Sequence, residues 1–103
     1  MAEGIYWDEG NPGKCQKHDV TIAEIEHVLL HSDKVIIPVE GSGETRFIAI
    51  GLTPNGRFAF VVFTSRARGG KLIPRPISAR YMHRKEVRTY GQAVARLQER
   101  RGG

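Results

Sequence analysis

The chain has 103 residues and a formal net charge of +5, with 40% hydrophobic and 26% charged residues. These values are ordinary for a globular protein and exclude a disordered or collagen-like chain. The length fits one domain with a modest core, too small to enclose a large cofactor on all sides. We predict a single domain over residues 1–103, with its core at about 5–90 and a helical extension at 91–103.

Hydrophobic runs in the sequence are short, and none approaches the roughly 20 residues that a membrane span requires. The N-terminus carries Glu3 and lacks the apolar stretch of a signal peptide. The single cysteine, Cys15, has no partner for an internal disulfide, which suits a reducing compartment. We therefore expect a cytoplasmic protein without membrane contact.

Charge is distributed unevenly along the chain. Up to Ser65 there are five Lys/Arg against nine Asp/Glu, and from Arg66 onward there are eleven against two. A basic half on a short domain suggests a polyanionic partner, most often nucleic acid. The alternative is that these arginines only solvate an exposed helix.

The first predicted elements are a loose N-terminal segment and one clear helix. Residues 5–7 form an apolar patch that suits a short strand or a lid over the core, and Pro12 could open a helical turn that carries residues 14–18. Thr21 and Glu24 have the spacing of a capping box. They predict a helix over Thr21–His31, whose apolar residues recur at helical spacing.

Four strands are expected next, and the closing segment is again helical. The strands cover Val35–Val39, Phe47–Leu52, Phe58–Phe63 and Lys71–Ala79, with a turn at Thr53–Gly56 and a loop at Arg68–Gly70. Pro38 confines the first strand to an edge or places the residue at an end of the strand, and Pro74 and Pro76 predict that the last strand is bulged or at an edge. A helix over 82–100 follows, with Val87, Tyr90, Val94 and Leu97 at helical spacing and a bend or an end at Gly91. The order indicates an α+β fold with an antiparallel sheet of about four strands between N-terminal and C-terminal helices.

Five short motifs follow one another along the chain. They are Trp7-Asp8, Lys17-His18 followed by Val20, Arg46 to Gly51, Val61 to Arg66 with its Thr64-x-Arg66 ending, and Ile77-Ser78-Ala79-Arg80 with Arg84, Glu86 and Tyr90 downstream. In this order they resemble motifs of the BrnT family of toxins from bacterial type II toxin–antitoxin modules, and the last is similar to the family's most specific run. At Asp19 the family usually has glycine.

The resemblance implies a fold similar to the RelE/ParE toxins and a ribonuclease that arrests growth. It also implies a cognate antitoxin, similar to BrnA, that neutralises the toxin. The complex is then expected to bind operator DNA through the antitoxin.

Metal-free RNA cleavage needs a base for the 2′-hydroxyl proton, cations for the transition state and an acid for the departing 5′-oxygen. We predict that Arg66 and Arg80 stabilise charge, and that Glu86 serves as base or orients an arginine. His18 could be acid or base, as could His83, and an aromatic such as Tyr81 could stack on a base. The predicted RNA-binding residues are Lys17, Arg46, Arg84, Arg88 and Tyr90. No metal or other cofactor is expected.

Each assignment has a structural alternative. Arg80 and Glu86 could be only an ion pair, Tyr90 and Trp7 only core residues, and His18 only a polar residue before a helix. The whole protein could then be a non-catalytic module that binds nucleic acid or a partner. A third interpretation is a zinc site, because the spacing of Cys15-x2-His18 and His27-x3-His31 imitates a zinc finger.

Overall fold

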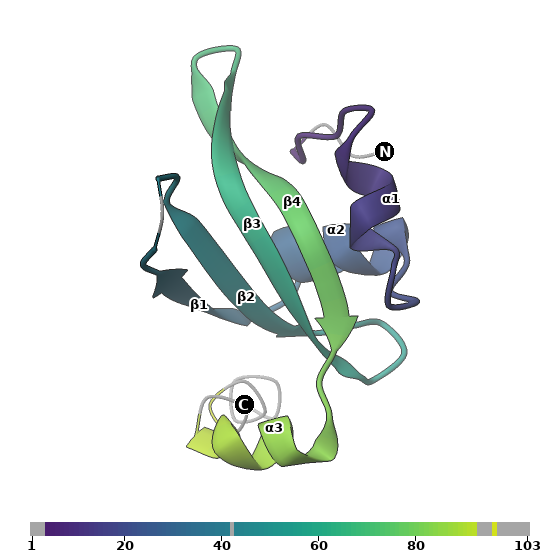
Figure 1. Cartoon of the computed structure of the whole chain (residues 1–103). Helices are drawn as coiled ribbons and strands as arrows, with labels where there is room; N and C mark the ends of the chain where they lie inside the picture. The colour runs from purple at the N-terminus through teal and green to yellow at the C-terminus, as the bar shows by residue number, and fades with distance from the viewer. Residues whose placement is uncertain (1–3, 42, 93–95, 97–103) are drawn as a thin grey trace.

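The computed structural model describes residues 4–41, 43–92 and 96. Within these ranges the elements are α1 (Asn11–Cys15), α2 (Ile22–Leu30), β1 (Lys34–Val39), β2 (Arg46–Leu52), β3 (Phe58–Arg68), β4 (Lys71–Tyr81) and α3 (Arg84–Thr89). The strands form one antiparallel sheet in the order β1-β2-β3-β4. Figure 1 shows α1 and α2 on one side of the sheet and α3 near its lower end. The predicted α+β fold is confirmed.

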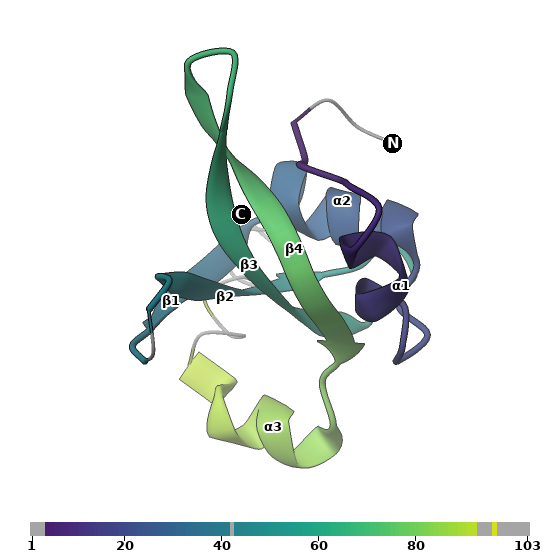
Figure 2. The same cartoon turned by 45° about the horizontal axis from the view of Figure 1, so that its top comes forward.

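The sheet has an apolar cluster on each face. Successive side chains of a strand point to opposite faces, so Ala49 and Val61 pack with α2, whereas Ile50 and Phe60 face α3. Figure 2 shows the helices separated in this way by the strands. The cluster on the α2 side is larger, and α3 covers a smaller cluster through Val87 and other residues.

Helix α2 begins as the sequence predicts. The Thr21 hydroxyl accepts from the Glu24 amide at 3.1 Å, and the Glu24 carboxylate accepts from the Thr21 amide at 3.0 Å. The helix packs very closely on β2, since a Cβ placed on Gly51 would lie 3.0 Å from a methyl group of Val28. A side chain at position 51 would require this methyl group to move by a few tenths of an ångström.

Strand β3 is longer than the sequence predicts, because it ends at Arg68 rather than Phe63. The extra length comes from pairing with β4, which continues to the Arg68↔Lys71 pair. Gly69 and Gly70 close the hairpin with φ angles of 57° and 78°, where glycine carries no steric cost. Figure 1 shows this hairpin extending beyond β1 and β2.

Strand β4 is an edge strand with a bulge, as its prolines predict. Val62 pairs with Ser78 while Phe63 pairs with Pro76, so Ile77 is the extra residue. The Pro74 carbonyl accepts from the Tyr6 amide at 2.8 Å. The amide and carbonyl of one strand residue point to the same side, so the nitrogen of Pro74 faces away from β3 and the ladder loses no hydrogen bond.

The N-terminal segment covers the core without forming a strand. Ile5 is buried, and the Trp7 indole donates to Glu26 at 2.9 Å. Helix α1 begins with Pro12 near its start but ends at Cys15, so the predicted turn over residues 14–18 is helical only at its beginning. Asp19 then adopts φ 67°, the left-handed region that favours glycine and that aspartate tolerates better than most residues.

Helix α3 starts at Arg84 and has Tyr90 as its C-cap, next to the bend or end predicted at Gly91. Residues 91 and 92 are again helical. Val94, Leu97 and most of the expected extension at 91–103 lie outside the described residues. None of the helices described is long and apolar enough to cross a membrane.

Candidate functional site

An arginine and a glutamate meet where β4 turns into α3. Arg80 lies near the end of β4, and both of its terminal nitrogens donate to Glu86, at 2.6 and 2.5 Å. Glu86 also accepts from the His83 amide at 2.9 Å, which holds the start of α3 against the strand. The guanidinium lies 4.7 Å from the centre of the Phe60 ring, directly across the ladder.

This pairing fixes the charge of both partners. The hydrogen bonds from Arg80, followed by the one from the His83 backbone, lower the pKa of Glu86 to about 2. The same hydrogen bond raises the pKa of Arg80 above its usual value. At neutral pH the site therefore holds a carboxylate and a guanidinium that is still 41% exposed.

A hollow of about 270 Å³ opens beside this pair on the α3 face of the sheet. His18 reaches it from the turn after α1, and Tyr90 from the end of α3. Tyr90 packs edge-to-face on Phe60, with ring centres 5.4 Å apart. The hollow thus combines a cation, a carboxylate and an imidazole with an aromatic wall. Its lining residues are His18, Ile48, Phe60, Val62, Ser78, Ala79, Arg80, Glu86 and Tyr90.

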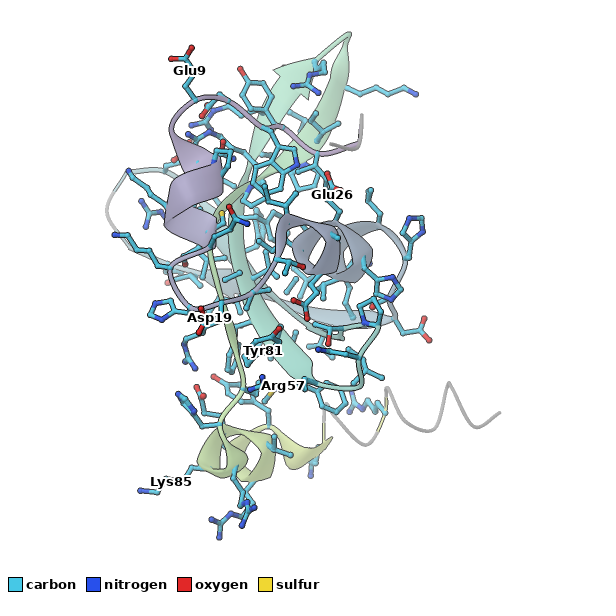
Figure 3. The ribbon with its side chains drawn as sticks, turned by 90° about the vertical axis from the view of Figure 1, so that its right-hand side faces the viewer. Glu9, Asp19, Glu26, Arg57, Tyr81 and Lys85 are labelled. Carbon is cyan, nitrogen blue, oxygen red and sulfur yellow. The ribbon has the colours of Figure 1, made fainter. Side chains whose placement is uncertain are left out.

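A second hollow, of about 400 Å³, adjoins the first and shares Arg80 and His18 with it. It also contains Lys17, which the sequence predicts as RNA-binding. Figure 3 shows Asp19, Tyr81 and Arg57 on this side of the molecule, between α1 and α3.

The second hollow contains residues that the sequence did not single out together. The Tyr81 hydroxyl donates to Glu24, 2.7 Å from each carboxylate oxygen, and the Arg57 guanidinium lies 3.6 Å from the centre of the Tyr81 ring. Burial raises the pKa of Glu24, but hydrogen bonds from Thr21 and Tyr81 outweigh it and leave this pKa below the usual value. No sequence signal links Arg57, Tyr81 and Glu24, because their contacts join three distant segments.

The structure separates the remaining predicted residues from these hollows. Arg66 pairs with Glu44 and lies six residues along β3 from Phe60, the partner of Arg80, which corresponds to about 20 Å. Arg46 lies in the same region, because it contributes to lowering the pKa of Glu44 after the larger effect of Arg66. Arg66 and Arg46 are therefore not brought together with Arg80, Glu86 and His18.

Two further predicted residues, Arg84 and Arg88, are exposed on α3, and neither forms an ion pair within the part of the chain described. Cys15 is completely buried, and desolvation raises the pKa of its thiol to about 11. Among the described residues, no group of three or more His, Cys, Asp or Glu is arranged to hold a metal ion. The zinc-finger spacing does not bring its four residues into one cluster.

Comparison with known proteins gives one finding about the family. A family model described as "Ribonuclease toxin, BrnT, of type II toxin-antitoxin system" matches residues 7–86. The matched segment includes both hollows except for Tyr90. No curated protein matches the chain.

Proposed function

The chain belongs to the BrnT family of ribonuclease toxins of type II toxin–antitoxin systems, and we propose that it cleaves RNA with its own side chains, without a metal ion. The observation that carries this proposal is that His18, Arg80 and Glu86, from two different segments, line one hollow. Membership of the family already implies an RNA substrate and an antitoxin partner.

The proposed reaction is an attack of the ribose 2′-hydroxyl on the neighbouring phosphorus. The 2′-oxygen loses its proton to a base, the bond from phosphorus to the 5′-oxygen breaks, and an acid protonates that oxygen. The products are a 2′,3′-cyclic phosphate and a 5′-hydroxyl end. Arg80 would donate hydrogen bonds to the non-bridging oxygens, where negative charge develops.

His18 is the better candidate for proton transfer. An imidazole can take up and release a proton near neutral pH. Glu86 is a weak base, because Arg80 holds the pKa of its carboxyl at about 2. Glu86 would instead position Arg80 through two hydrogen bonds. Of the two roles that the sequence left open for Glu86, we therefore propose the orientation of an arginine rather than the role of base.

Neutralisation would come from a BrnA-like antitoxin that covers the basic surface. Arg84, Lys85 and Arg88 are exposed along α3, beside the first hollow. Acidic or amphipathic helical segments complement such a surface. We propose that the complex binds operator DNA through the antitoxin.

The test is controlled expression in bacteria with mapping of new RNA 5′ ends. We expect growth arrest and new 5′-hydroxyl ends with the wild type, and neither with Arg80→Ala or His18→Ala. Removal of one charge-stabilising donor, or of one proton-transfer group, costs about 100-fold or more. Arg75→Ala is the matched control, because Arg75 lies on the same strand and also pairs with a carboxylate, Asp8. Circular dichroism must show that each variant is folded.

Several outcomes would contradict the proposal. An Arg80→Ala variant as toxic as the wild type would mean that the site is elsewhere. Equal soluble expression of the wild type without new RNA ends would favour the non-catalytic binding module. Loss of cleavage by the purified wild type in EDTA would contradict the metal-free mechanism.

A further inference from the structure

Tyr81 and Arg57 line the second hollow, and Glu24, which does not line it, anchors Tyr81. Glu24 is 9% exposed and is held by the N-terminus of α2, and it accepts the Tyr81 hydroxyl on both oxygens. The Tyr81 ring is therefore fixed at the end of β4. The Arg57 guanidinium lies over this ring, 3.6 Å from its centre. An exposed arginine, which would otherwise sample many rotamers, is thus held at the rim of the hollow.

Stacking leaves the polar edge of this guanidinium available. The distance of 3.6 Å between Arg57 Cζ and the ring centre is typical of a guanidinium that lies flat on an aromatic ring, with its in-plane N–H donors pointing outward. Among the residues described, no side chain or carbonyl accepts a hydrogen bond from the Arg57 guanidinium. Planar N–H donors of this kind match the oxygens of a phosphate.

The charges around the hollow favour an anion that also carries hydrogen-bond donors. Three cations line it, namely Lys17, Arg57 and Arg80, and Asp19 is the carboxylate at its rim. Arg80 is paired with Glu86, and Arg57 helps to lower the pKa of Glu24, so the hollow offers an anion Lys17 and the outward N–H donors of Arg57. A carboxylate accepts from ribose hydroxyls and base amino groups, so the set suits a nucleotide better than a free phosphate.

The second hollow adjoins the first, because His18 and Arg80 line both. A nucleotide chain whose scissile phosphate sits at Arg80 must continue to both sides. The aromatic wall of Phe60 and Tyr90 suits a base on one side. The second hollow then receives the neighbouring nucleotide. A volume of about 400 Å³ falls within the range of ordinary ligand sites.

We propose that Arg57 and Lys17 form a second phosphate-binding subsite, which holds the RNA nucleotide next to the cleaved bond, with Tyr81 and Glu24 as the support that positions Arg57. This inference rests on the proposed function for the identity of the polymer. It adds a binding residue, Arg57, and a direction in which the RNA leaves the site.

The test measures RNA binding separately from cleavage. A short single-stranded RNA with 2′-O-methyl riboses has no attacking hydroxyl, so its affinity can be followed by fluorescence anisotropy over a series of salt concentrations. Each phosphate contact in single-stranded nucleic acid contributes about 0.7 to the slope of log K against log salt. We expect Arg57→Gln to lower this slope by about 0.7 and to weaken binding roughly three- to tenfold at low salt.

The matched control is Arg68→Gln. Arg68 also lies over a tyrosine ring, that of Tyr6, at 4.8 Å, but at the other end of the β3–β4 hairpin. The control removes the same charge and the same type of stacking contact, and its slope should equal that of the wild type. Arg57→Lys keeps the charge but loses the planar donors, so we expect it to bind with intermediate affinity. Thermal unfolding verifies that all three variants are folded.

An Arg57→Gln variant with the wild-type slope would overturn the subsite. An equal decrease of the slope in Arg68→Gln would also overturn it, because the effect would then come from overall charge. Cleavage of unmodified RNA tests the proposed function separately. Cleavage by the wild type with no role for Arg57 in binding rejects the subsite alone. Arg57-dependent binding by a wild type that cleaves nothing keeps the subsite and rejects the nuclease.

Discussion

Each end of the β3–β4 hairpin has an arginine–glutamate ion pair, but the two pairs have different surroundings. Toward the tip, Arg66 pairs with Glu44, and the two side chains are 37% and 42% exposed. At the base, Arg80 pairs with Glu86 through two hydrogen bonds, and Glu86 is only 23% exposed. The pair at the base also has neighbours from α3 and from the turn after α1, which supply the walls of a hollow. An arginine near a carboxylate becomes a candidate site only where other elements converge on it.

The same contrast holds for the two stacked arginines. Arg68 near the tip lies over Tyr6, which belongs to the N-terminal segment. Arg57 at the base lies over Tyr81, whose hydroxyl is anchored by buried Glu24. At the tip, Arg68 also donates to the Ile5 carbonyl, so the two arginines differ in what anchors their tyrosine: a buried carboxylate holds the Tyr81 ring. Three predictions test whether this difference in surroundings is a difference in function.

The largest effect is expected from Glu86→Gln compared with Glu44→Gln. Loss of the Glu86 charge leaves Arg80 without its bidentate partner, so we expect kcat for RNA cleavage to fall roughly tenfold to 100-fold, with a smaller change in KM. Glu44→Gln should change kcat less than twofold. Steady-state cleavage of a fluorescent RNA measures both. Equal losses of kcat in the two variants would mean that the ion pair at the base contributes no more to cleavage than the pair at the tip.

A smaller effect is expected from Arg66→Ala. The sequence predicts a catalytic role for Arg66, yet its side chain pairs with Glu44 about 20 Å from Arg80. A residue so far away can contact another part of a long RNA but not the reacting phosphate. We expect RNA affinity to fall roughly twofold to threefold with little change in kcat. A loss of kcat as large as that of Arg80→Ala would place Arg66 at the reacting phosphate after all.

The smallest effect concerns stability at low pH. The pKa of Glu86 falls from the ordinary 4.5 to about 2 on folding, so the folded state keeps this carboxyl ionised where the unfolded chain protonates it. Its contribution is fully present above pH 4.5 and is lost as the pH falls toward 2. Urea unfolding at several pH values should show a weaker decline in the free energy of unfolding for Glu86→Gln over this range. An unchanged decline would mean that Asp8, Glu24 and Glu44, whose pKa values are also lowered, account for it.

Local features of the fold could be predicted from sequence because they depend on neighbouring residues. The capping box joins Thr21 to a residue three positions away, and the glycines at 69 and 70 form the tip of the hairpin. The length of β3 beyond Phe63 could not be predicted, because residues 64–68 are mostly polar and become a strand only by pairing with β4. The irregular path of residues 5–7 likewise depends on a distant contact, the hydrogen bond from the Tyr6 amide to Pro74 in β4.

The candidate site likewise has one part that could be predicted from the sequence and another that could not. The short distance in sequence from Arg80 to Glu86 made their pairing predictable, and the structure contains it. The position of His18 beside Arg80 depends on the way the turn after α1 meets the end of β4. The Arg57 side chain contacts Tyr81, which lies in a distant segment, so only the folded chain reveals this contact.

The prolines of the sheet have a consequence for association between molecules. Pro38 lies in β1, and Pro74 and Pro76 lie in β4, so both outer strands contain residues that cannot donate a backbone hydrogen bond. The carbonyls of Pro74 and Pro76 are already occupied by Tyr6 and Asn11. A fifth strand from another molecule, paired with either outer strand, would meet proline positions that lack a backbone N–H donor. Growth of the sheet into fibrils is disfavoured, and a protein partner has more to gain from side-chain contacts than from joining the ladder.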